Sequence, residues 1–173
     1  MIIMIFVFDT SAFLMGLANR IVKKDVIIYT TPSVISEIRN KWSTEMINAL
    51  VSSGLVKVTK PSNESINKVK SVHKKLGGKG ITETDLEIVA LALELDRAST
   101  IVFTNDYAVQ NILAFFGIKF ASIGLRGIKE IWKWLKRCPV CKIYYSYEKN
   151  YCEVCGTELK PIKKRINVIQ NGT

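Results

Sequence analysis

The stretch IIMIFVFDTSAF, residues 2–13, decides the fold, because an apolar run of seven residues ends at an aspartate. A short apolar run bounded by a polar residue predicts a buried strand. The run has no basic segment before it and is too short for a membrane span. We therefore expect a cytoplasmic protein that does not enter a membrane, with Asp9 at the carboxyl end of its first strand.

Apolar runs and helical patterns alternate through the first 125 residues. We predict further strands at 26–30, 55–59, 100–103 and 118–121, and helices at 11–20, 32–42, 45–51, 64–76, 82–96 and 107–116. This alternation predicts an α/β fold with a central parallel sheet flanked by helices. In such sheets, functional sites lie beyond the carboxyl ends of the strands.

Four acidic residues follow or begin these elements and are the candidate catalytic set: Asp9, Glu37, Asp85 and Asp106. Clustered carboxylates repel one another unless a cation neutralises them. Mg²⁺ and Mn²⁺ prefer carboxylate oxygen, and such sites hydrolyse phosphodiesters by activating water. We therefore predict that the four acids hold one or two Mg²⁺ or Mn²⁺ ions. Ser11 and Thr104 are predicted to support the site by orienting a carboxylate or a bound water.

Each acid also has a structural explanation that the sequence leaves open. Asp9 and Asp106 can act as helix N-caps. Asp85 stands at capping-box spacing from Thr82, although it also begins the apolar face of its helix. Glu37 alone reads as an exposed surface residue. Only the complete set indicates a metal site.

Other catalytic systems have less support in the sequence. The one histidine, His73, lies in the basic stretch SVHKKLGGKG, which argues against a Ser-His or Cys-His nucleophile. The glycine-rich segment 77–80 lacks the frame of a phosphate-binding P-loop. We interpret it as a connecting loop.

All cysteines fall in two C-x-x-C pairs, Cys138 with Cys141 and Cys152 with Cys155. This spacing predicts a structural zinc ion bound by four thiolates, with no open position for catalysis. Two disulfides are the alternative, but they are rare in a reducing cytosol. We divide the chain into a domain at 1–125, a linking helix at 126–137, a zinc ribbon at 138–160 and a basic flexible tail at 161–173.

The positive charge is concentrated near the end of the chain. Residues 1–125 hold 14 Lys and Arg against 11 Asp and Glu, whereas residues 126–173 hold 11 against 4. Bases and aromatic residues also alternate there, as in proteins that bind single-stranded nucleic acid. The candidate RNA-binding residues are Lys142, Tyr144, Tyr145 and Lys149.

The order FDTSAF, SEIRN, TETDLEIVALALE, FTNDYAVQN resembles the PIN-domain ribonucleases, and the added ribbon resembles the Nob-type endonucleases. The resemblance implies a PIN-like fold, catalytic Mg²⁺ or Mn²⁺ on the four acids, and cleavage of single-stranded precursor rRNA at the 3′ end of the small-subunit (16S) rRNA. It also implies a KH-domain partner. Asn105 stands where relatives can carry another aspartate. Alternatives are a PIN toxin of a toxin–antitoxin pair and a non-catalytic RNA-binding adaptor.

Overall fold

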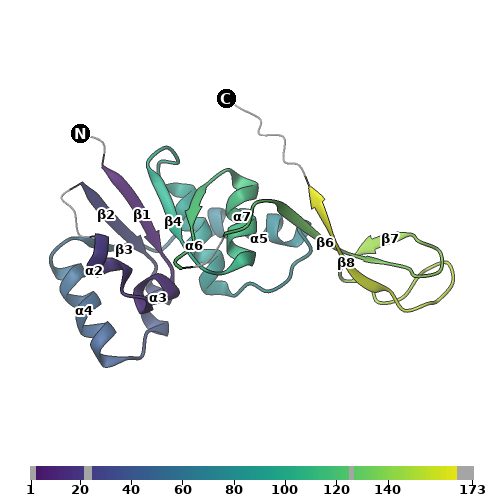
Figure 1. Ribbon diagram of the computed structural model, residues 1–173, viewed down its shortest axis with the longest axis horizontal. Coiled ribbons are helices and arrows are strands. Elements are labelled where there is room, and N and C mark those ends of the chain that lie inside the picture. Colours follow the sequence, from purple (N-terminus) through teal and green to yellow (C-terminus); the bar gives the residue numbers. More distant parts are fainter. Residues whose placement is uncertain (1–2, 22–24, 125–126, 167–173) are drawn as a thin grey trace.

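The sheet of the larger part of the molecule is parallel throughout, as predicted. The computed structural model describes residues 3–21, 25–124 and 127–166 and has an α/β body at one end and a small antiparallel sheet at the other (Figure 1). The body sheet has the strand order β3-β2-β1-β4-β5. Its strands are β1 (Met4–Phe8), β2 (Val26–Thr30), β3 (Val56–Val58), β4 (Thr100–Phe103) and β5 (Lys119–Ala121).

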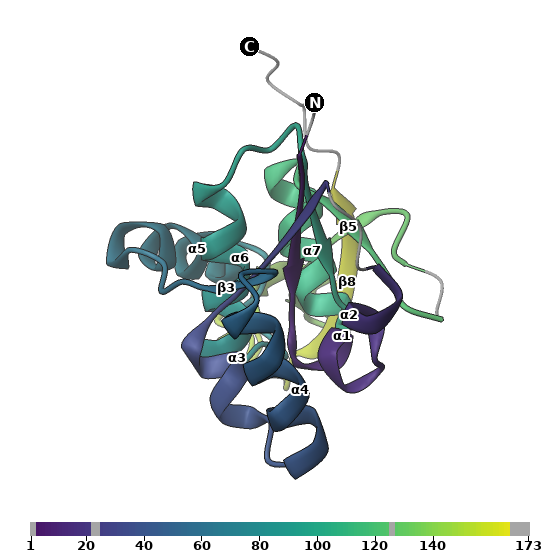
Figure 2. The same cartoon turned by 90° about the vertical axis from the view of Figure 1, so that its left-hand side faces the viewer.

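Helices cover both faces of this sheet. They are α1 (Thr10–Leu14), α2 (Leu17–Ile21), α3 (Pro32–Glu37), α4 (Lys41–Ser52), α5 (Asn63–Lys75), α6 (Glu83–Glu94) and α7 (Tyr107–Phe116). Figure 2 shows α5 and α6 on one side of the strands and α1 and α2 on the other. The core between the layers buries side chains such as Phe8, Ile88 and Val102 completely. Each such side chain contributes roughly 1.5–3 kcal/mol to folding.

The order of the strands reverses between β1 and β4, which makes this the topological switch point of the sheet. These two strands are neighbours, with Phe8 opposite Phe103. From β1 the chain moves outward through β2 and β3, and from β4 it moves to β5 on the other side. A crevice forms at such a switch point, beyond the carboxyl ends of the strands. Asp9 and Thr104 are the first residues after these two strand ends.

Two predicted helices are wrong in extent. The helix expected at 11–20 is interrupted at Gly16, whose φ of +67° is left-handed. The helix expected at 32–42 ends at Glu37. A new helix then begins at Lys41, because the side chain of Asn40 accepts hydrogen bonds from the backbone N–H groups of Trp42 and Ser43.

The linking helix predicted at 126–137 is wrong, since Ile131–Arg137 forms strand β6. It pairs antiparallel with β7 (Tyr144–Ser146) and β8 (Lys160–Ile166), in the order β7-β6-β8. The apolar spacing also suits a helix, but isoleucine and tryptophan favour strands and β8 offers a full-length partner. Pairing runs from Ile131 opposite Ile166 to Arg137 opposite Lys160.

The flexible tail predicted at 161–173 is also wrong over residues 161–166, which belong to β8. Residues 167–173 lie outside the described part of the chain. The antiparallel sheet therefore extends the predicted zinc ribbon in both directions, over residues 131–166. Among the helices that the structure describes, none has the length and apolar character needed to cross a bilayer.

Candidate active site and zinc site

Asp9 is the most deeply buried of the four candidate acids, with 7% of its surface exposed. Its Oδ1 accepts hydrogen bonds from Oγ of Ser11 at 2.7 Å and from the backbone N–H of Ala12 at 2.8 Å. Burial raises the pKa of the Asp9 carboxyl and the charge of Asp85 adds to this, although the hydroxyls of Thr104 and Ser11 oppose it. Asp9 is thus both an N-cap and a carboxylate whose negative charge is poorly solvated.

Asp106 follows β4, the strand next to β1, so it lies at the same carboxyl ends of the strands as Asp9. Its Oδ1 caps α7 by accepting from the backbone N–H groups of Ala108 at 2.6 Å and Val109 at 3.2 Å. Its own backbone N–H donates to Oγ1 of Thr104 at 3.1 Å. The buried Thr104 therefore lies between the two acids, as a supporting residue should.

Asp85 forms the capping box that its spacing predicts. Its Oδ2 accepts from the backbone N–H of Thr82 at 3.0 Å and from the Thr82 hydroxyl at 2.6 Å, and its own N–H donates to that hydroxyl at 3.2 Å. Its charge also raises the pKa of Asp9. A carboxylate has two oxygens, so capping and metal binding are compatible roles for one residue.

Glu37 reaches the same region from the end of α3. Its Oε2 accepts a hydrogen bond from Oγ1 of Thr10, the residue directly after Asp9, at 2.5 Å. Glu37 is exposed, in agreement with the sequence reading of it as a surface residue. The structure nevertheless links Glu37, through Thr10, to the carboxyl end of β1. We call the carboxyl ends of β1 and β4, which Asp9 and Asp106 follow, the acidic edge.

The chemistry of this set fits a hard divalent cation. All four side chains offer carboxylate oxygens, the ligands that Mg²⁺ and Mn²⁺ prefer. Three of the acids, Asp9, Asp85 and Asp106, take part in helix caps, which limits their motion. Among the described residues, however, no three of the four acids form a group whose ligand oxygens all lie within 4.8 Å of one another. Direct ligation by all four requires the acids to move together or to bind through water.

Asn105 and two threonines take part in the architecture of this edge. Oδ1 of Asn105 accepts from the backbone N–H of Ile123 at 2.7 Å, and its Nδ2 donates to the Ile123 carbonyl at 3.2 Å. Asn105 therefore holds the chain after β5. Sequence reasoning missed Thr10, and also Thr30, whose buried hydroxyl donates to the carbonyl of Phe8 at 2.9 Å. A threonine at the end of a strand is a weak signal, because threonine is common in strands.

The four cysteines form the second cluster. Their sulfur atoms all lie within 4.8 Å of one another, and those of Cys138 and Cys155 are 3.5 Å apart. Sulfurs at 2.3 Å from one zinc ion lie about 3.8 Å apart in a tetrahedron, whereas a disulfide is about 2.05 Å long. All four cysteines are free, so the alternative of two disulfides is contradicted. The arrangement fits a closed structural zinc site.

The two cysteine pairs adopt the same backbone turn. The N–H of Lys142 donates to the carbonyl of Cys138 at 3.0 Å, and the N–H of Gly156 donates to that of Cys152 at 2.9 Å. Both donor residues are left-handed, with φ of +61° for Lys142 and +70° for Gly156. Each turn therefore directs its two sulfurs toward the same point.

The candidate RNA-binding residues divide into inward and outward groups. Tyr145 packs on the cysteines, and its hydroxyl bonds Sγ of Cys152 at 3.2 Å. This bond, together with hydrogen bonds from the backbone of Cys155 and Val154, lowers the pKa of Cys152 to about 6, which favours the thiolate that zinc binds. Tyr144 and Lys142 are exposed, whereas Lys149 is exposed but paired with Glu153. We therefore exclude Tyr145 from the RNA surface proposed below.

Comparison with known proteins assigns the chain to a class. Residues 6–95 match the family model described as the PIN domain of ribonuclease. Together with the parallel sheet and its acidic edge, this match defines the chain as a PIN-domain ribonuclease.

Sequence relatives that the chain covers over most of their length identify its family within the PIN-domain ribonucleases. The chain is 38% identical to endoribonuclease Nob1 of Pyrococcus abyssi, over 92% of this chain and 94% of that one. It is 33% identical to endoribonuclease Nob1 of Methanothermobacter thermautotrophicus, over 92% of both chains. It is also 32% identical to ribonuclease VapC1 of Thermoplasma acidophilum, over 91% of this chain and 77% of that one. The chain belongs to the Nob1 family of PIN-domain endoribonucleases.

Proposed function

We propose that this endoribonuclease depends on Mg²⁺ or Mn²⁺ and cuts single-stranded precursor rRNA to produce the 3′ end of the small-subunit rRNA. The proposal is supported by the position of Asp9 and Asp106 after the neighbouring strands β1 and β4, and above all by the charge of Asp85 acting on the buried Asp9. Glu37 is linked to the same strand end through its hydrogen bond with Thr10. The Nob1 relatives support an RNA substrate. The KH-domain partner and the cytoplasmic location stay predictions.

Charge separation along the chain supports this reading. An acidic edge repels RNA, so the phosphates need attraction from elsewhere. Residues 126–173 supply 11 of the 25 basic residues. On the ribbon, the guanidinium of Arg137 lies 5.3 Å and the ammonium of Lys164 6.0 Å from the ring centre of the exposed Tyr144. We propose that this face of the ribbon holds RNA while the body cuts it.

Each residue then has a defined role. Asp9, Asp85, Asp106 and Glu37 hold the ion or ions, and Ser11 and Thr104 keep Asp9 oriented. A bound divalent ion supplies a more acidic water and stabilises the departing 3′ oxygen. Asp9 must be ionised to act, and burial raises its pKa, so protons compete with the metal for this carboxylate. One zinc ion on the four cysteines keeps the ribbon folded.

The test is cleavage of an RNA spanning the 3′ end of small-subunit rRNA by zinc-loaded protein prepared in buffer free of Mg²⁺ and Mn²⁺, before and after one of these ions is added. Wild-type protein should cut at the junction, and Asp9→Asn should cut at least about 100-fold more slowly. Asp96→Asn is the matched control, because Asp96 also caps a backbone N–H but precedes β4, at the opposite edge of the sheet. Equal loss in both variants would contradict the assignment.

The similarity to ribonuclease VapC1 of Thermoplasma acidophilum keeps a toxin-like ribonuclease as a second candidate. Such an enzyme would cut RNA that lacks the rRNA junction at a comparable rate. Binding without any metal-dependent cutting would instead indicate an RNA-binding adaptor. The same assay therefore separates the three functions.

A further inference from the structure

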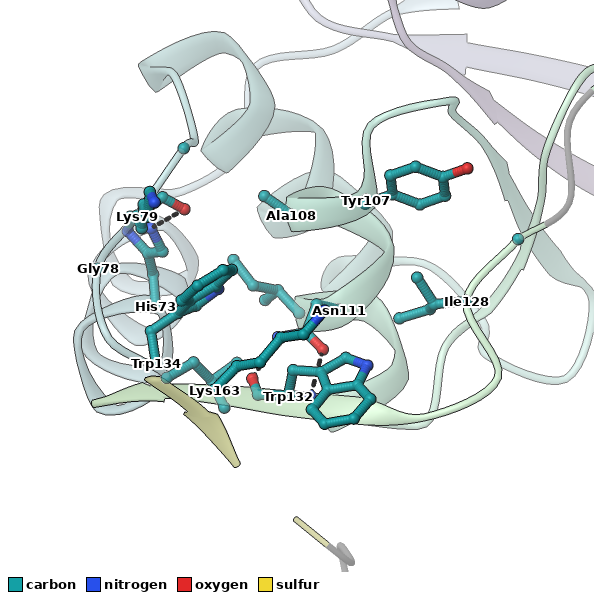
Figure 3. Close-up of a pocket in the computed structure, with 14 residues that line it drawn as sticks. His73, Gly78, Lys79, Tyr107, Ala108, Asn111, Ile128, Trp132, Trp134 and Lys163 are labelled. Carbon is teal, nitrogen blue, oxygen red and sulfur yellow. Dashed lines mark hydrogen bonds between the residues drawn. The ribbon is translucent and has the colours of Figure 1, made fainter. Parts of the chain in front are cut away.

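A cavity of about 540 Å³ lies where the ribbon meets the body (Figure 3). Ligand pockets in proteins measure roughly 300–1,000 Å³. Aromatic and basic side chains face this cavity from both parts of the molecule: Lys79 and Tyr107 from the body, and Trp132, Trp134 and Lys163 from the ribbon. The residues that line the cavity in the described structure include no carboxylate. The cavity therefore suits an anionic, planar ligand.

Hydrogen bonds to the backbone of β6 fix the walls of the cavity. Oδ1 of Asn111 accepts from the N–H of Trp132 at 2.8 Å, and Nδ2 of Asn111 donates to the Trp132 carbonyl at 2.7 Å. The N–H of Trp134 donates to the carbonyl of Leu76, at the end of α5, at 2.8 Å. A side chain on Gly77 would approach Cβ of Trp134 to 2.4 Å. These contacts hold the backbone of the two tryptophans in place relative to the body.

Both tryptophan rings are paired with ammonium groups. The Nζ of Lys79 lies 4.6 Å from the ring centre of Trp134, and the Nζ of Lys163 lies 5.0 Å from that of Trp132. Both lysines are exposed, and their flexible stems let the charges swing from a ring to a neighbouring phosphate. A base can then stack on the vacated ring face. Rings for bases beside cations for phosphates are the combination that binds single-stranded nucleic acid.

The cavity also adjoins the acidic edge. Tyr107, on its wall, directly follows Asp106, and Asn111 lies about 6 Å beyond Tyr107 along the same helix. A strand of RNA leaving the acidic edge along α7 therefore reaches the cavity before the exposed face of the ribbon. This path applies to an RNA that is bound at the acidic edge, and it gives no argument for an acidic peptide in the cavity.

We propose that this cavity is a base-binding pocket for the RNA substrate. One unstacked base inserts against Trp132 or Trp134, and Lys79 and Lys163 bind the phosphates on either side of it. The pocket would set the distance between the ribbon-bound part of the strand and the bond that is cut. This inference rests on the proposed function, because it takes the occupant to be the same single-stranded RNA.

The experiment measures RNA affinity in full-length, zinc-loaded protein carrying Asp9→Asn. The probe is a single-stranded junction RNA, together with copies that each have one abasic ribose at a successive position. One position should weaken binding about tenfold when its base is removed. In the double variant Trp132→Leu with Trp134→Leu, removing the base at that position should no longer weaken binding. In the control Trp42→Leu, which removes an exposed ring on α4, removing the same base should still weaken binding.

A second pair of variants keeps the test decisive if the tryptophan changes disturb folding. Lys79→Gln with Lys163→Gln should lower affinity about tenfold, because both charges are exposed and the fold does not depend on them. Lys57→Gln with Lys119→Gln, which removes two exposed charges elsewhere on the body sheet, is the control. Equal affinities in the two double variants would overturn the pocket.

The outcomes separate the pocket from the proposed function. Metal-dependent cleavage by wild-type protein, with no position-specific effect of base removal, would overturn the pocket alone. A position-specific effect without any cleavage would overturn the proposed function alone. Stronger competition by an acidic peptide than by a single-stranded RNA of equal charge would assign the cavity to a protein partner and overturn the proposal.

Discussion

Thr10 and Glu37, which are 27 residues apart in sequence, share a hydrogen bond of 2.5 Å between Oγ1 and Oε2. This bond brings the acid with the weakest local sequence support to the position next to Asp9. Glu37 ends α3 and is exposed, so the bond to Thr10 limits the number of positions its carboxylate adopts. Thr10 is therefore expected to matter for cleavage without being an acid.

Replacing Thr10 by valine removes this hydroxyl and keeps the shape of the side chain. We expect cleavage to fall about 3- to 10-fold, because a hydrogen bond to a charged group contributes about 1.5–3 kcal/mol when buried and less when exposed. Thr44→Val is the control, since the Thr44 hydroxyl bonds only to backbone carbonyls in the described structure. Single-turnover rates at saturating metal provide the measurement, and equal rates for the two variants would exclude a role for Thr10.

The two roles of Asp85 can be separated by substitution. Asp85→Asn keeps a capping oxygen but removes the charge, so cleavage should fall at least about 100-fold while the free energy of unfolding changes by less than about 1 kcal/mol. Thr82→Ala removes the partner in the capping box and should cost about 0.5–2 kcal/mol of stability. Its cleavage rate should stay within about threefold of wild type. The reverse pattern would make Asp85 a capping residue alone.

Asp9→Asn should stabilise the zinc-loaded protein near neutral pH when no Mg²⁺ or Mn²⁺ is bound. Burial raises the pKa of Asp9 in the folded state above its unfolded value, so its ionised form opposes folding. The stability associated with protonated Asp9 is present below the unfolded pKa and is lost as pH rises through the folded pKa. The gain from Asp9→Asn should therefore shrink as the solution is acidified. Thermal melts of zinc-loaded protein without added Mg²⁺ or Mn²⁺, at several pH values, measure this gain, and each kcal/mol should shift the melting temperature by about 2–4 °C.

We expect one zinc ion per chain, and we expect only the ribbon to need it for folding. Zinc binding contributes about 10 kcal/mol or more to the folding of such modules. Removing it should unfold residues 131–166 and leave the α/β body intact. Tyr145→Phe should weaken zinc binding about 10-fold, because the Tyr145 hydroxyl bonds Sγ of Cys152. Tyr144→Phe should not change it, and competition with a chromogenic chelator compares the two variants.

Gly77 is expected to control how the ribbon docks. Gly77→Ala places a Cβ 2.4 Å from Cβ of Trp134, in addition to straining a φ of +109°. Gly54→Ala is a control for backbone strain, since Gly54 has φ of +76° with no neighbouring atom within 4 Å of an added Cβ. The Gly77 variant should lose more stability than the Gly54 variant, by about 1–3 kcal/mol. Chemical denaturation measures this difference, and equal losses would mean that the contact with Trp134 carries no energy.

Several local elements were predictable because their signals are local. The helix predicted at 107–116 is confirmed residue for residue, with Asp106 as its N-cap and Gly117 in the left-handed conformation at its end. The early end of α3 was also encoded in the sequence, because Asn40 is a favoured N-cap. The prediction there gave priority to the apolar pattern and missed the capping residue.

The error at residues 131–137 has a different origin. Ile131, Trp132 and Leu135 fall on one face of a helix, so periodicity alone favours that structure. The hydrogen bonds that decide for a strand come from β8, from Asn111 and from Leu76, all at least 20 residues away or on another element. No property of the segment itself reveals these partners.

The chemical groups of this protein could be read from its sequence: three aspartates after strands or at the start of helices, a glutamate within a helical pattern, and two pairs of cysteines with zinc spacing. Only the tertiary structure decided how they combine. Placing β1 beside β4 brings Asp9 and Asp106 to the same end of the sheet, and the docking of β6 on α7 creates the cavity lined by Lys79 and the two tryptophans. Periodicity and capping act within a few residues, whereas strand pairing and docking join segments far apart in the chain, so their outcome depends on the whole fold.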